Sequence, residues 1–267
     1  MTARAATPWS RRDLGAEQLI RAANLRLLAI IGATPDEFPL RFTQASDMIG
    51  PSTWNSEIMM PDQASEKAEV KMYSDFKSPY AYLAFDPGMA LGQRFDVRVR
   101  WIPFQLRLKG KGERSVYSEY KVKYSYMDAR RWAKPRGLWI RGPLKIYDTT
   151  PAAIGGLFAE TQGRLLDFCR TAFKKFFLRE FEADQPEAVA RLIADLGLSD
   201  GHYLEYLAGE GREAYDRCQE EAAADHVFGV PFFLFAGEPF WGYDRLALLE
   251  QRLEEAGLAI GDKVTAA

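Results

Sequence analysis

A strand, a helix and a second strand follow one another over residues 70–103, and this pattern constrains the fold most strongly. Residues 70–73 and 97–103 alternate in the manner of strands, the second with Arg98 and Arg100 between apolar side chains. Ser78-Pro79 opens the segment between them, because serine is a favoured N-cap and proline is favoured in the first turn of a helix. The segment therefore predicts a βαβ unit.

The C-terminal part of the chain returns to strands. Residues 231–235 form a short apolar run, a turn is expected over 236–239, and Phe240-Trp241 continues as a partner strand before a helix over 243–258. Apolar residues at helical spacing fill the middle of the chain, where we expect helices over 165–177, 186–196, 199–207 and 213–225. The order predicts an α/β chain with a thioredoxin fold and an inserted all-helical domain.

These elements divide the chain into segments. We expect a thioredoxin-like domain made of residues 68–105 and 226–258, an inserted helical domain at 106–225, and a C-terminal tail at 259–267. Residues 1–67 are an N-terminal extension, with a helix over 14–31 and a proline-containing loop that runs to Glu69. We expect this extension to be a tail that packs on the body, with a lid or a partner-binding arm as the alternative.

Composition excludes several classes of function. The net charge is −2, from 35 basic and 37 acidic residues, which argues against nucleic-acid binding. Cys169 and Cys218 lie far apart and on helical apolar faces, so we expect both to be structural, and with only two histidines a metal site is not expected. No apolar run near the N-terminus is long enough for a membrane span. Charged residues interrupt the segment after Arg11-Arg12 where an export signal would be apolar, so we expect a cytoplasmic protein.

The turn at Ser78 is the first candidate functional feature. The start of a helix presents unpaired backbone N–H groups and a partial positive charge, which favour an anion such as a thiolate. In redox thioredoxin folds a Cys-X-X-Cys motif occupies this turn, but here the four positions read Ser78-Pro79-Tyr80-Ala81. Disulfide exchange at this site is excluded because no thiolate is available to attack. The serine hydroxyl can instead donate a hydrogen bond to the thiolate of a ligand.

Two further features lie near the C-terminus. Pro231 directly precedes a strand and follows Val230, so the bond between them is a candidate for a cis peptide, and the loop would leave the Val230 backbone free to pair with an extended peptide. An ordinary trans proline is the alternative. The stretch Trp241-Gly242-Tyr243-Asp244 opens the last helix, where a ligand carboxylate is favoured and where Asp244 could also serve as an N-cap.

These motifs together resemble those of a known family. The stretch from Tyr73 to Ala84, around Asp75-Phe76-Lys77-Ser78-Pro79, is similar to the opening motif of 2-hydroxychromene-2-carboxylate isomerases and kappa-class glutathione transferases, which are DsbA-like. Residues 227–231 and 240–246 resemble the closing motif, and residues 121–132 resemble the first inserted helix. The resemblance covers about residues 70–256.

The resemblance implies a function and a set of site residues. It implies a glutathione-dependent isomerase in which Ser78 is catalytic and activates the glutathione thiol, so that reversible addition to a double bond allows cis–trans isomerisation. It places Val230 and Pro231 against the glutathione backbone and the turn of Trp241, Gly242, Tyr243 and Asp244 at its γ-glutamyl end. Lys109 is expected near the substrate carboxylate, with Lys111 and Arg114 as rivals, and Tyr80 is a second candidate for substrate binding. Relatives are commonly dimers, so a homodimer is expected.

Other functions remain open at this point. A kappa-like glutathione transferase or peroxidase acting on another small electrophile would carry the same motifs. A non-catalytic binding protein is the alternative from another class: Phe232 and Tyr243, which depart from the residues usual in the family, would then reshape the cleft for a peptide or a different thiol.

Overall fold

The computed structural model describes residues 67–106 and 119–261. The helix expected at 14–31, most of the N-terminal extension, Lys109, Lys111, Arg114 and residues 262–267 lie outside the described residues.

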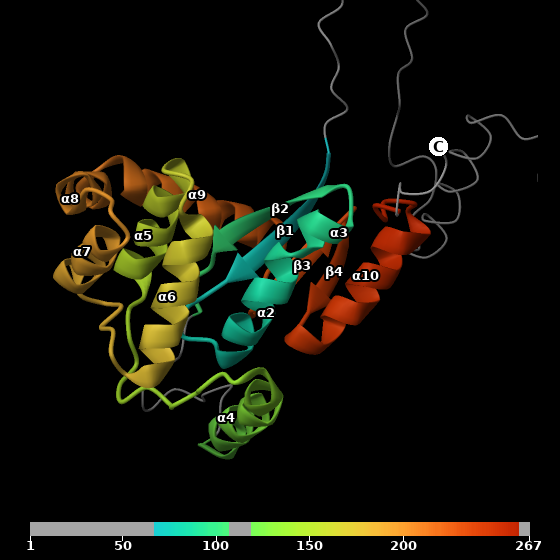
Figure 1. Cartoon of the computed structure of the whole chain (residues 1–267), viewed down its shortest axis with the longest axis horizontal. Helices are drawn as coiled ribbons and strands as arrows, with labels where there is room; N and C mark the ends of the chain where they lie inside the picture. Colours follow the sequence, from blue (N-terminus) through green and yellow to red (C-terminus); the bar gives the residue numbers. More distant parts are fainter. Residues whose placement is uncertain (1–66, 107–118, 262–267) are drawn as a thin grey trace, which may run out of the picture. The chain divides into compact units, whose positions relative to one another are not determined.

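A four-stranded sheet forms the centre of the fold (Figure 1). Its strands are β1 (Ala68–Ser74), β2 (Val97–Pro103), β3 (Phe232–Phe235) and β4 (Glu238–Trp241), in the order β2-β1-β3-β4. β1 and β2 are parallel, as a helical crossover requires, and β3 is antiparallel to both β1 and β4. The predicted strands are confirmed, with two corrections at their ends. Ala68 and Glu69 belong to β1, and Glu238 and Pro239 belong to β4, because positive φ at Ala236 and Gly237 turns the chain in only two residues.

Alternate residues of the sheet pack on opposite sides. On one face, Met72 and Phe233 lie against α2 (Pro79–Met89), where Gly88 comes so close that an added Cβ would be 2.9 Å from the Phe233 ring. On the other face, Tyr73 and Lys71 both bond to Asp225 at the end of α9 (Glu210–Ala224). The sheet is therefore covered on both sides, as expected of a βαβ unit.

The inserted helices pack together beside the sheet (Figure 1). They are α5 (Thr150–Thr161), α6 (Leu165–Leu178), α7 (Pro186–Asp195), α8 (Asp200–Ala208) and α9. The predicted apolar stripe of α6 is buried from Phe168 to Phe177, and Phe173 stacks on Tyr82 of α2 at 5.5 Å between ring centroids. This aromatic contact joins the helical block to the helix that starts at Ser78.

α5 is a helix that the sequence did not predict. Pro151, Gly155 and Gly156 weaken its helical signal. The absence of a side chain at both glycines permits close packing. A Cβ on Gly156 would lie 2.7 Å from the ring of Trp101, and one on Gly155 would lie 2.7 Å from Val189. Close approach between α5, the sheet and α7 therefore outweighs the propensity penalty.

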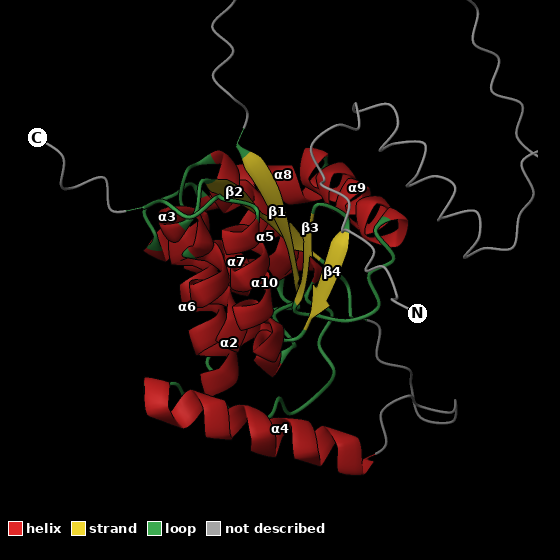
Figure 2. Cartoon of the chain, turned by 90° about the vertical axis from the view of Figure 1, so that its right-hand side faces the viewer, coloured by secondary structure: helices red, strands yellow, loops and turns green. Residues whose placement is uncertain are grey.

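α4 (Glu119–Ala133) lies apart from the α5–α9 block and crosses below α2 (Figures 1 and 2). It corresponds to the helix expected over residues 121–132. It continues into η2 (Lys134–Arg136), whose Arg136 donates to the Leu83 carbonyl of α2 at 2.6 Å. Residues of α4 and of the start of α2 both line the cavity described below.

The remaining elements complete the thioredoxin-like part. They are α3 (Leu91–Arg94), η3 (Tyr243–Arg245) and α10 (Leu246–Glu255). The helix expected over 243–258 is therefore shorter and begins as a 3₁₀ turn. Asp244 makes no capping bond in it, so the N-cap role that was the alternative for this residue is wrong; Gly242 and Arg245 occupy the cap positions.

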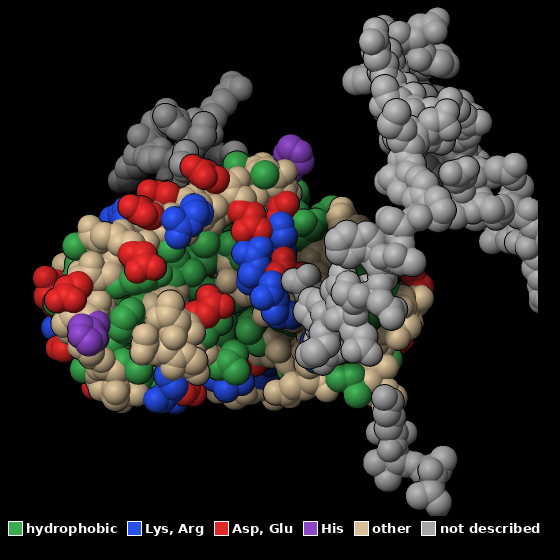
Figure 3. All heavy atoms as spheres, turned by 90° about the horizontal axis from the view of Figure 1, so that it is seen from above, with side chains coloured by type: hydrophobic (Ala, Val, Ile, Leu, Met, Phe, Trp, Pro, Cys, Tyr) green, Lys and Arg blue, Asp and Glu red, His purple; other side chains and the backbone are tan. Residues whose placement is uncertain are grey.

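Charges of both signs lie side by side on the surface, as one face shows (Figure 3). Arg100, for example, pairs with Glu69 at 3.1 Å and also bonds to Glu221. Within residues 67–106 and 119–261, no helix is long and apolar enough to cross a bilayer.

Candidate functional site

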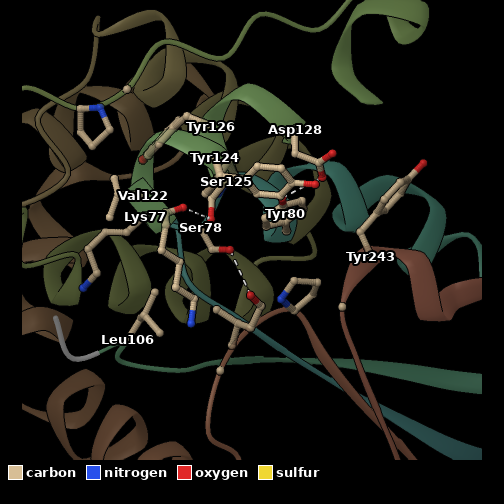
Figure 4. A pocket seen from close by; sticks show the side chains of 18 of the residues that line it. Lys77, Ser78, Tyr80, Leu106, Val122, Tyr124, Ser125, Tyr126, Asp128 and Tyr243 are labelled. Atoms are coloured by element: carbon tan, nitrogen blue, oxygen red, sulfur yellow. Dashed lines mark hydrogen bonds between the residues drawn. The ribbon is translucent and has the colours of Figure 1, made fainter. Parts of the chain in front are cut away.

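A cavity of about 1110 Å³ opens between the start of α2, the helix α4 and the loops that flank β3 and β4 (Figure 4). Seven described aromatic side chains contribute to its walls, namely Tyr80, Tyr124, Tyr126, Trp132, Tyr147, Trp241 and Tyr243. Every predicted site residue that the structure describes lines it: Ser78, Tyr80, Val230, Pro231 and the turn from Trp241 to Asp244. The sequence features separated by 150 residues thus meet in one place, and the size suits a small-molecule ligand.

Ser78 caps α2 at the base of this cavity. Its Oγ accepts from the Ala81 N–H at 3.2 Å, which confirms the predicted N-cap, and donates to the Val230 carbonyl at 3.1 Å. The side chain is held in place by both bonds, since the residue is only 4% exposed. A group bound here would meet the positive end of an eleven-residue helix and a fixed hydroxyl.

The bond between Val230 and Pro231 is cis, as the sequence suggested. The expectation that the Val230 backbone is free holds only in part. Its carbonyl accepts the Ser78 hydroxyl, whereas its N–H has no hydrogen-bond partner within residues 67–106 and 119–261. The Pro231 carbonyl accepts from the Gly242 N–H at 3.0 Å, which fixes the neighbouring turn.

The turn after β4 depends on Gly242. Its φ of 120° lies in the region that glycine adopts most readily. The ring of Tyr243 points away from Ser78 and packs against Trp132 of α4, with 5.5 Å between ring centroids (Figure 4). Phe232 is buried in β3 and does not line the cavity. Neither of these unusual residues therefore fills the space beside Ser78.

Tyr80 connects the two walls of the cavity. Its hydroxyl donates to Asp128 of α4 at 2.9 Å. Burial and the bond to Asp128 raise the pKa of Tyr80 well above its ordinary value, so the phenol stays protonated at neutral pH. Asp128 lies in the segment that resembles the family's first inserted helix, but the sequence did not assign it to the site; the structure places it on the cavity wall.

Asp75 and Lys77 form a buried polar cluster beside Ser78 that the sequence also did not predict. Asp75 accepts from Thr149 Oγ1 at 2.8 Å, from the Leu106 N–H at 2.7 Å and from the Lys77 N–H at 2.9 Å. It also pairs with Lys77 Nζ at 3.2 Å. Two of its partners, Leu106 and Thr149, come from distant parts of the chain, so only the folded structure brings them to Asp75.

Neither cysteine belongs to the site. Cys169 is fully buried in α6, and desolvation raises its pKa. Desolvation also raises the pKa of Cys218 to about 11. Both thiols are therefore protonated at neutral pH, in accord with the structural role expected of them.

Known proteins are similar to this chain in sequence and in fold. The family model of the DSBA-like thioredoxin domain matches residues 69–254. The 2-hydroxychromene-2-carboxylate isomerase of Pseudomonas putida is 27% identical over 192 residues, which are 69% of this chain and 93% of that protein. The isomerase of the same name from Sphingobium xenophagum is 25% identical over 194 residues, which are 69% of this chain and 97% of that protein.

Solved structures of known proteins have a similar fold. A structure of 2-hydroxychromene-2-carboxylate isomerase superposes with a TM-score of 0.61 at 26% identity, covering 71% of this chain and 96% of that one. A probable DsbA oxidoreductase from Streptomyces coelicolor gives a TM-score of 0.60 at 20% identity, over 75% of this chain and 93% of that one. The second likeness bears on the fold alone.

Proposed function

Because this chain belongs to the family of DsbA-like thioredoxin domains, we propose that it is a glutathione-dependent isomerase of 2-hydroxychromene-2-carboxylate or a close analogue. The observation that carries the proposal is the position of Ser78. It occupies the start of α2, where a redox enzyme of this fold needs a thiol, and it faces an aromatic cavity. A chain without sulfur at that place needs a ligand to bring it, if thiol chemistry is to occur there.

The residues present fit glutathione. An extended peptide can pair with the Val230 backbone in the manner of an added strand, and the Val230 N–H has no other partner among the described residues. The turn from Trp241 to Asp244 lies beside it and is assigned to the γ-glutamyl end. When bound, glutathione supplies a thiol nucleophile that adds reversibly to a conjugated double bond.

Ser78 changes its hydrogen bond in this proposal. Its proton is committed to the Val230 carbonyl, so it cannot serve a sulfur atom at the same time. If a ligand N–H bonded to the Val230 carbonyl instead, the Ser78 hydroxyl would be free to donate to a thiolate and would favour its ionised form. Val230 thereby couples peptide binding to thiol activation.

The aromatic walls position the substrate. Tyr80, Trp132 and Tyr147 offer flat apolar surfaces that suit a conjugated ring and exclude water from the double bond. The hydroxyl of Tyr80 is held by Asp128, so this wall keeps its orientation.

The test is the rate of glutathione-dependent isomerisation, followed by ultraviolet absorbance, in wild type, Ser78→Ala and Ser125→Ala. Loss of one preorganised donor to a developing anion lowers turnover by about 100- to 1000-fold, and this is the effect expected for Ser78→Ala. Ser125 is the matched control, since it lines the same cavity and, among the described residues, its hydroxyl donates only to the Lys121 carbonyl of its own helix.

Full activity in Ser78→Ala would show that the assigned role is wrong. Turnover of a generic electrophile such as 1-chloro-2,4-dinitrobenzene, without isomerisation of the chromene carboxylate, would assign the chain to the glutathione transferases instead.

A further inference from the structure

Lys77 is a cation buried at the edge of the cavity. It precedes Ser78 directly, lines the cavity and is only 8% exposed (Figure 4). A lysine so poorly exposed to water requires acceptors for its charge. Its ammonium therefore has a role in either stability or binding.

The partners of Lys77 do not use all of its donors. An ammonium carries three N–H donors. Within residues 67–106 and 119–261, Lys77 Nζ has a single hydrogen-bonding or ion-pair partner, Asp75 Oδ2 at 3.2 Å. Asp75 is held in turn by two backbone N–H groups and by the hydroxyl of Thr149, so its position is fixed. The cluster thus presents an ammonium of defined position with spare donors.

Two other described cations of the cavity wall, Lys145 and Arg245, form ion pairs at the surface. Lys145 pairs with Asp184 at 2.8 Å, lies over the ring of Tyr147 and has a side chain that is 48% exposed. Arg245 pairs with Asp244 at 3.0 Å and is 54% exposed. A charge in contact with water is worth much less to a ligand than a buried one.

We propose that Lys77 is a specificity residue that binds the carboxylate of the second ligand, a flat conjugated carboxylic acid. This inference rests on the proposed function, because it places that ligand beside the Ser78 sulfur site. Lys77 and Ser78 line the same cavity, so a carboxylate on Lys77 would leave the adjoining conjugated carbons on the Ser78 side of that cavity. The aromatic walls then hold the ring.

The test is calorimetric binding of trans-2-hydroxycinnamate and of its methyl ester, each to protein saturated with glutathione. Wild type is expected to bind the acid about tenfold or more tightly than the ester, because a hydrogen bond to a buried charge is lost in the ester. Lys77→Met should abolish this difference, and Lys77→Arg should retain part of it. Lys145→Met is the matched control and should keep the difference, since that side chain is half exposed.

Equal binding of acid and ester by wild type overturns the inference without any variant, so the test does not depend on the stability of Lys77→Met. An unchanged preference for the acid in Lys77→Met also overturns it. So does weaker binding of glutathione itself to Lys77→Met, which would assign the lysine to a glutathione carboxylate.

The same titrations separate this inference from the proposed function. If wild type fails to bind glutathione, the cinnamate titrations are repeated without it. A Lys77-dependent preference for the acid in that experiment upholds the inference although the proposed function fails. If the enzyme turns over with glutathione but Lys77→Met leaves the preference for the acid unchanged, the proposed function stands and the inference fails.

Discussion

Replacement of Asp75 by asparagine should destabilise the protein by about 3–5 kcal/mol, the usual effect of removing one partner of a buried ion pair. The side chain of Asp75 is fully buried. Oδ1 accepts from the Lys77 N–H and from Thr149 Oγ1, and Oδ2 accepts from the Leu106 N–H and from Lys77 Nζ. An amide keeps one acceptor oxygen and turns an NH₂ group toward two donors, whichever way it is oriented. Two bonds are thus lost, and the Lys77 ammonium loses the charge of its ion-pair partner.

The measurement is urea unfolding followed by tryptophan fluorescence. With a denaturant slope of about 3 kcal/mol per M, the midpoint should fall by roughly 1–2 M. Asp167→Asn is the matched control, because Asp167 is 50% exposed and pairs with Arg164 on the surface of α6. That change should alter stability by no more than about 1 kcal/mol. If both variants unfold at the same midpoint, the Asp75 cluster does not hold the Ser78 turn and the reasoning fails.

Three further predictions concern packing, acid stability and thiol reactivity. Gly156→Ala should destabilise the fold by about 1–3 kcal/mol, because the new methyl group would lie 2.7 Å from Trp101; urea unfolding measures this. The hydrogen bond from Arg100 holds the pKa of Glu221 at about 2, below its ordinary 4.5, so the stability that this carboxylate contributes is lost as pH falls from 4.5 toward 2. Glu221→Gln should therefore flatten the acid limb of the stability–pH profile. With a pKa of about 11, Cys218 should react very slowly with iodoacetamide at pH 8, as mass spectrometry would show.

Each of these has a control. Gly201→Ala adds the same methyl in α8, where it would meet only Ser199 Oγ at 3.8 Å, and it should not destabilise. Glu213→Gln removes a charge from an exposed position of the same helix as Glu221 and controls for the change in net charge. Protein unfolded in urea should be alkylated quickly at both cysteines. Equal effects of a variant and its control, or fast alkylation of the native protein, would contradict the corresponding prediction.

Local signals were enough to predict the thioredoxin-like part of the fold. Alternation in β1 and β2 and the Ser78-Pro79 cap act over a few residues, and the structure confirms them. α5 could not be predicted, because Gly155 and Gly156 weaken the helical signal. They allow close contacts with α6, α7 and β2, and those contacts exist only after folding. The 3₁₀ start of the last helix was missed for the same reason, since Gly242 is fixed by a bond to Pro231.

The candidate site was predicted in part. Ser78, Val230 and Pro231 carry strong local patterns, and they meet in the structure. The Asp75–Lys77 cluster was missed because its partners Leu106 and Thr149 are distant in sequence. A charged pair within the turn before the helix was the only sequence signal.

The most direct test of the central claim is the pKa of the glutathione thiol in the bound state, measured by thiolate absorbance near 240 nm as a function of pH. A free thiol of this kind titrates at about pH 8.5. Glutathione bound to wild type is expected to titrate at least about one pH unit lower, and glutathione bound to Ser78→Ala is expected to titrate close to the free value. Equal thiol pKa values in the two complexes, or no binding of glutathione by the wild type at millimolar concentration, would contradict it.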